Sequence, residues 1–91
     1  MFDLPEELRA EVSRIRVECL PHAHDSEGPV RLVLIGEDDH TLFTMRFTPA
    51  QARDSGLAVA RLLRLLLPTT NTHRLSDGLL RAARRVWSAR N

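Results

Sequence analysis

The side chains in this sequence best suited to bind a ligand are arginines, which gather towards its C-terminal end. All thirteen basic residues are arginine, and lysine is absent. Guanidinium groups form paired hydrogen bonds with phosphate and with carboxylate. A solvated helix surface, or ion pairs with the acidic N-terminal residues, explains the same pattern without a ligand. The candidate residues for binding a nucleic acid or an acidic protein surface are Arg74, Arg81, Arg84, Arg85 and Arg90.

The charge is divided unevenly along the chain. Residues 1–60 hold six arginines and eleven acidic residues, a net of −5, whereas residues 61–91 hold seven arginines and one aspartate, a net of +6. Such an asymmetry is typical of a nucleic-acid-binding surface, but also of a fold whose two halves complement each other. A sequence pI of about 8.1 and the lack of an aromatic stacking set argue against a dedicated nucleic-acid-binding domain.

Two further polar clusters are weaker candidates for a binding site. The acidic segment Glu37, Asp38 and Asp39 forms a possible acidic surface for a basic partner or a cation, but a polar hairpin turn is the preferred explanation. His22 and His24, with Cys19 and His40, are conceivable zinc or nickel ligands. Their spacing matches no established ligand pattern, so we expect no metal site and no cofactor.

Catalytic patterns are missing from the sequence. It has no glycine-rich phosphate loop, no nucleophile elbow and no paired carboxylates at helical spacing. Cys19, the single cysteine, is expected to be a small core residue on the inner face of a strand. We therefore expect that the protein is not an enzyme and has no catalytic residues.

The stretch from Thr48 to Leu67 predicts the central helix. Thr48 is a suitable N-cap, Pro49 suits the first helical position, and Gln51 completes a capping box. Pro68 stops the helix. Gly56 lies inside it, either to allow close approach of another element or as a tolerated imperfection. Apolar and small residues form one stripe at positions 52, 56, 59, 60, 63, 66 and 67, and a second row at 58, 62 and 65.

The residues before this helix predict a short helix and three strands. Residues 3–12 are typical of a helix, and residues 13–19 alternate like a strand, although one long helix to Cys19 is the alternative. Residues 30–35 and 40–47 form two more strands, joined by a turn at 36–39 into an antiparallel hairpin. In the last strand Phe43, Met45 and Phe47 are expected on one side, with Leu42, Thr44 and Arg46 on the other.

A second amphipathic helix is predicted after the central one. Ser76 would cap it, and it would run from Asp77 to Arg90. The polar segment from Thr69 to Ser76 would connect the two helices. This eight-residue connection is longer than the usual turn of a DNA-binding helix-turn-helix.

These elements predict one α+β domain covering residues 1–91, in which a three-stranded antiparallel β-meander packs on the central helix. The uncovered sheet face and the second apolar row of that helix favour a homodimer. The residues expected to serve dimer contacts or core packing are Leu62, Leu65, Leu66 and Trp87.

No motif in the chain is specific enough to indicate a family. The leading expectation is a small non-enzymatic protein that acts through protein–protein contacts, as an adaptor or inhibitor of a larger partner, such as a nucleic-acid-handling protein. A nucleic-acid-binding regulator is the alternative. The acidic start resembles no signal peptide, and no apolar run is long enough to cross a membrane, so we expect a cytoplasmic protein.

Overall fold

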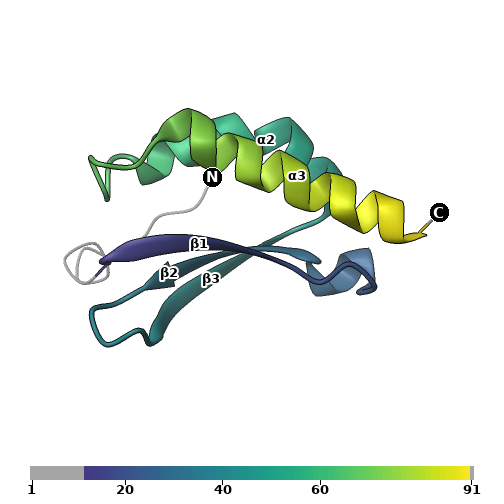
Figure 1. Cartoon of the computed structure of the whole chain (residues 1–91), viewed down its shortest axis with the longest axis horizontal. Coiled ribbons are helices and arrows are strands. Elements are labelled where there is room, and N and C mark those ends of the chain that lie inside the picture. The colour runs from purple at the N-terminus through teal and green to yellow at the C-terminus, as the bar shows by residue number, and fades with distance from the viewer. Residues whose placement is uncertain (1–11, 91) are drawn as a thin grey trace.

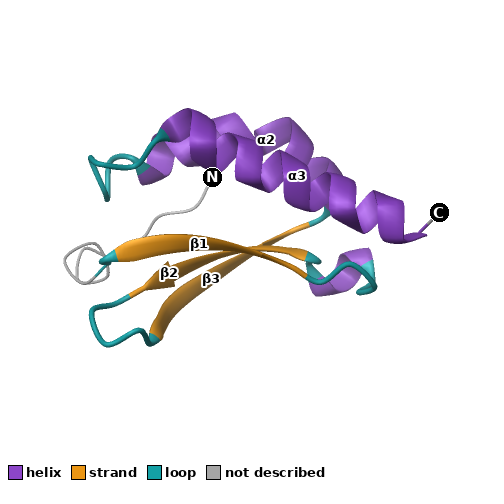
Figure 2. Ribbon diagram, in the orientation of Figure 1, coloured by secondary structure: helices purple, strands orange, loops and turns teal. Residues whose placement is uncertain are grey.

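Two helices cover one face of a three-stranded antiparallel sheet in the computed structural model (Figures 1 and 2). The structure describes residues 12–90. The α+β class, the meander and the two helices are therefore confirmed, whereas the helix expected over 3–12 lies almost entirely outside the described residues. The elements in order are β1 (Arg14–Cys19), a 3-10 turn η1 (Asp25–Glu27), β2 (Val30–Ile35), β3 (Thr41–Phe47), α2 (Pro49–Leu63) and α3 (Thr72–Arg90).

The sheet has the order β1-β2-β3, so β2 is central and β1 and β3 are its edges. Residues 14–19 form a strand and not the end of a long helix, as their strict alternation predicted. In the register of β1 with β2, Arg14 lies opposite Ile35 and Cys19 opposite Val30. This pairing places Ile15 and Val17 on the face that the helices cover, where both pack against the core.

The start of β3 differs from the prediction. Leu34 pairs with Phe43 but Ile35 pairs with Thr41, so Leu42 is an additional residue at a register shift. Such a bulge changes which side of the sheet a residue faces. Leu42 consequently packs against the core, where the alternation had placed it on the opposite face, and Phe43 is 39% exposed.

The core lies between the sheet and the helical layer. Its strand residues come mainly from the central strand, and its helix residues from one stripe of each helix. The buried members are Val12, Val30, Leu32, Leu34, Met45, Ala52, Val59, Leu63, Leu79, Ala82, Ala83 and Val86.

The sheet face opposite the helices also buries two apolar side chains. Val33 and Ile35 are only 2% and 1% exposed. In the register they neighbour Arg16 and Arg14 of β1, and the long stems of arginines can cover apolar surface while the charged heads stay in water. Because this face is shielded within the single chain, it gives no reason to expect a dimer. The open sheet face therefore carries no argument for the homodimer, which stays a prediction.

The capping box of α2 is confirmed. The Thr48 hydroxyl accepts a hydrogen bond from the Gln51 amide at 3.1 Å, and the Gln51 side chain accepts one from the Thr48 amide at 2.9 Å. The helix ends at Leu63, before the predicted end at Leu67. The next residues form tighter bonds of the 3-10 type, from the Leu66 amide to the Leu63 carbonyl at 2.9 Å, and Leu67 precedes proline, which disfavours the α conformation.

α3 begins five residues earlier than predicted, at Thr72 instead of Asp77. Asn71 is the cap in place of Ser76, because its side-chain oxygen accepts a hydrogen bond from the Arg74 amide at 3.0 Å. Asparagine is as good an N-cap as serine, and this alternative start was missed. The connection between the helices now covers 64–71, which keeps its predicted length and shifts its position.

The two helices pack closely where Gly56 meets α3. A Cβ atom at position 56 would lie 3.5 Å from Leu79 Cβ and 3.7 Å from the Ser76 carbonyl oxygen. Gly56 does lie at a helix contact, but these are ordinary van der Waals distances, so the contact does not require glycine. Among the described helices, none has the length and apolar character needed to cross a bilayer.

Candidate functional site

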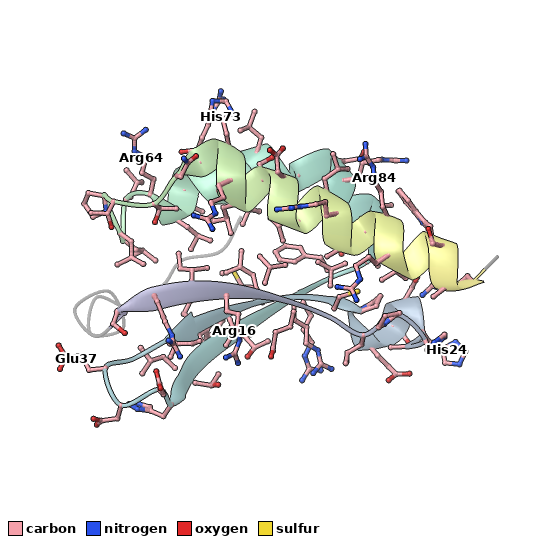
Figure 3. The ribbon with its side chains drawn as sticks, in the orientation of Figure 1. Arg16, His24, Glu37, Arg64, His73 and Arg84 are labelled. Carbon is pink, nitrogen blue, oxygen red and sulfur yellow. The ribbon has the colours of Figure 1, made fainter. Side chains whose placement is uncertain are left out.

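All five arginines of α3 are exposed. Figure 3 shows Arg84 on the outer side of the helical layer, together with His73 and with Arg64, which directly follows α2, while Arg16 lies beneath the sheet on the opposite side of the molecule. The sequence singled out only the arginines of the last helix. The helical hairpin adds a second source of positive charge from the end of α2.

A hollow of about 570 Å³ lies at the connection between α2 and α3. Arg61 in the last turn of α2 and Arg64 at its C-cap line it on one side, and His73 lines it from the first turn of α3. The hydroxyl and amide groups of the connection complete its polar wall. Its remaining lining residues are Leu57, Pro68, Thr69, Thr70, Asn71 and Thr72.

Arg61 and Arg64 are not among the candidate residues selected from the sequence. The signal that could have found them is the net charge of +6 over residues 61–91, which includes both. Their meeting with His73 depends on the fold, because the chain reverses direction between the two helices (Figure 1).

Two more hollows of about 500 Å³ each adjoin this turn. Arg74 and Arg81 line both of them. One extends to Ser13 and Arg14 at the edge of β1, and the other includes Arg84. Asn71 lines all three hollows, so they meet around the start of α3.

Most arginines at this turn, unlike several others in the protein, form no ion pair with a described carboxylate. Within residues 12–90, the ion pairs are Arg14–Asp39, Arg16–Glu18, Arg53–Asp54 and Arg90–Asp25. No described carboxylate forms a pair with an arginine of the three hollows, apart from the Arg14–Asp39 pair at their rim. We call Arg61, Arg64, Arg74, Arg81 and Arg84 the arginine collar.

Two of the predicted arginines lie outside this collar. Arg90 pairs with Asp25 at 2.7 Å and donates to the Ala23 carbonyl at 2.7 Å. It thus ties the C-terminal end of α3 to the loop that follows β1. Arg85 lies near enough to Cys19 for its positive charge to lower the pKa of that thiol, against the larger opposite effect of burial.

Cys19 has the environment of a core residue. Burial raises the pKa of its thiol, which keeps the less nucleophilic protonated form. Its sulfur lies 3.5 Å from the Ala82 carbonyl oxygen, to which the thiol donates a weak hydrogen bond. This setting gives no support to a nucleophilic role.

The acidic turn and the histidine loop lie at opposite ends of the sheet, as Glu37 and His24 show in Figure 3. Asp39 adopts a positive φ of 60° and pairs with Arg14 at 2.6 Å, whereas Glu37 and Asp38 are exposed. His40 belongs to the acidic-turn end, so the fold separates it from His22 and His24. Within residues 12–90, no three potential metal ligands come together.

A mainly apolar groove of about 550 Å³ lies between the edge strand β3 and α2. Arg46 and Phe47 line it from β3. From α2 come side chains that follow one another at helical spacing. These are Gln51, Ser55, Ala58, Val59 and Leu62.

The residues predicted for dimer contacts or core packing lie in different surroundings. Leu66 and Trp87 pack against the core, and the Arg53 guanidinium lies 5.3 Å from the centre of the Trp87 ring, within cation–π range. Leu62 lines the groove beside β3. Leu65 is 74% exposed and is the most exposed large apolar side chain of the described part.

The open sheet face carries arginines of its own. Arg31 lies between Glu18 and Arg46 in the strand register, and its Nε is buried without a hydrogen-bond partner. Because Arg14 and Arg16 are ion-paired on this face, its positive charge is better compensated than that of the collar.

No family model, curated protein or solved structure matches this chain.

Proposed function

We propose that this protein is a non-enzymatic binding protein that acts through protein–protein contacts, as a cytoplasmic homodimer. The observation that carries the proposal is the apolar groove between β3 and α2. A single unpaired cysteine is consistent with a reducing compartment. The dimer would in turn bind a different protein and act on it as an adaptor or inhibitor.

The groove lies beside an unpaired sheet edge. β3 is an edge strand of the sheet, so its outer backbone N–H and C=O groups have no strand partner within residues 12–90. Such an edge favours the addition of a further strand. An added strand of a second copy would continue the sheet and bring a second α2 against the groove.

The second apolar row of α2 lies on the same side. Ala58 and Leu62 line the groove. Leu65 lies in the turn that follows α2 and adds exposed apolar surface beyond the end of the helix. The sheet and α3 cover the first stripe of α2 and leave this row exposed. Phe43 of β3, at 39% exposure, adds apolar surface at the same edge.

A second copy fits this edge by charge as well as by shape. In a symmetric antiparallel pair of β3 strands, the start of one strand lies beside the end of the other. Glu37 and Asp38 come just before β3, and Arg46 lies near its end. The acidic turn of each copy would then lie next to Arg46 of the other, which pairs opposite charges twice.

Ala58→Glu tests the proposal, because Ala58 is exposed and lines the groove. A buried unpaired carboxylate at the interface should raise the dimer dissociation constant by at least about tenfold, or about 1.4 kcal/mol. Sedimentation equilibrium measures this constant. The matched control is Ala50→Glu, at an exposed position in the first turn of α2. Equal dissociation constants for both variants would rule out the groove as the interface.

A further inference from the structure

We propose that the arginine collar binds the phosphate backbone of a nucleic acid without regard to base sequence. This inference goes beyond the proposed dimer and does not depend on it, because the collar and the β3 groove share no residue. It involves Arg61 and Arg64, at the end of α2 and just after it, as much as the arginines of α3.

The charge of the collar is the first observation. Its five arginines are all exposed, and within residues 12–90 none forms an ion pair. Among the described residues that line the three hollows, Asp77 is the only acidic one. Arginines three apart on a helix lie about 5–6 Å from each other at Cβ, and their repulsion destabilises the helix. An anionic ligand would offset this repulsion.

The donors around the arginines are the second observation. Thr69, Thr70 and Thr72 supply hydroxyl groups, and Asn71 supplies an amide group, in the hollow that Arg61 and Arg64 line. Arginine forks and hydroxyl donors are the groups with which proteins bind phosphate oxygens. The first residue of α3 lies at the same place, so the positive end of the helix dipole points towards the ligand.

The extent of the hollows favours a chain of phosphates over a single phosphate group as the ligand. Three hollows of about 500 to 570 Å³ meet around Asn71, and each is large compared with one phosphate group. A backbone with regularly spaced phosphates would bring charge to several of them at once. The described lining residues include no Phe, Tyr or Trp, and His73 has their only aromatic ring, so the hollows lack the set of aromatic side chains on which successive bases stack. Binding should therefore be independent of sequence.

The experiment is fluorescence anisotropy with a fluorescein-labelled single-stranded DNA of about twenty nucleotides, titrated with the full chain between about 50 and 200 mM salt. Four or five phosphate contacts predict a slope of log K against log salt of about −3. Arg64→Ser should weaken binding several-fold and reduce the slope by about 0.7, equally for two unrelated base sequences.

The matched control is Arg16→Ser, which removes the same charge from an exposed position on the opposite side of the molecule (Figure 3). It should weaken binding less than Arg64→Ser. Equal losses would show that only net charge matters and would overturn the site. Absence of binding at the lowest salt, or tighter binding to polyglutamate of the same charge, would also overturn it, the latter in favour of an acidic protein. Sedimentation of Arg64→Ser distinguishes a loss of nucleic-acid binding from a loss of the dimer. The variant should sediment with the same oligomeric mass as the unchanged protein.

Discussion

At the scale of single residues, Cys19 controls how stability depends on alkaline pH. The sequence contains no tyrosine and no lysine, so Cys19 is the only side chain with an ordinary pKa between about 8 and 11. Burial raises the pKa of its thiol in the folded protein. The unfolded chain therefore loses this proton first, and the free energy of unfolding should fall as pH rises above about 8.5.

Urea unfolding measured from neutral pH to about pH 10.5 tests this assignment. Below the ordinary thiol pKa both states keep the proton, and Cys19 makes no contribution to the slope. Cys19→Ala should flatten the alkaline part of the profile, whatever its effect on stability at neutral pH. An unchanged alkaline fall in this variant would assign the effect to another group.

At the scale of elements, Gly56 tests how α2 and α3 pack. Gly56→Ala should raise the free energy of unfolding by about 0.5–1 kcal/mol, because alanine is the better helix former and its Cβ would meet Leu79 at an ordinary contact distance. Chemical denaturation measures the change. A loss of stability would mean that the two helices lie closer together than the Leu79 contact indicates.

The control for this substitution is Gly28→Ala. Gly28 has a positive φ of 63°, and a Cβ there would collide with Arg46 Cβ. The same change of residue should therefore cost about 1 kcal/mol or more at this position. A rise in the free energy of unfolding for Gly56→Ala and a fall for Gly28→Ala would separate the helical preference of alanine from its steric cost.

The sequence predicts elements well where local signals agree. The capping box at Thr48 and the alternation over 14–19 both describe the structure correctly. The ends of elements depend on competing signals, and the predictions were wrong there. Asn71 and Ser76 are both good caps, and only the folded chain shows that Asn71 begins α3. The alternating pattern of apolar and polar residues does not indicate the bulge at Leu42.

The candidate sites follow the same rule. Arg74, Arg81 and Arg84 could be selected from the sequence, because they lie on one exposed helix face. Arg61 and Arg64 join them only through the reversal of the chain between α2 and α3. Arg90 was selected too, but it forms an ion pair with Asp25 that no periodicity could indicate.

At the scale of the whole molecule, the symmetric dimer can be tested by exchanging the charges at positions 38 and 46. Arg46→Asp and Asp38→Arg should each weaken the dimer, since each places like charges beside one another across the two-fold axis, and their combination should restore it. Sedimentation equilibrium of the two single variants and the double variant measures the coupling. If the loss of dimerisation free energy in the double variant equals the sum of the losses in the two single variants, the antiparallel pairing of β3 is contradicted.

The mass of the unmodified chain in solution tests the account most directly. Sedimentation velocity at tens of micromolar should give a single species of twice the chain mass of 10.3 kDa, because the exposed row of α2 and the free edge of β3 would both be covered by a second copy. A species of 10.3 kDa at every concentration up to the limit of solubility would contradict the homodimer.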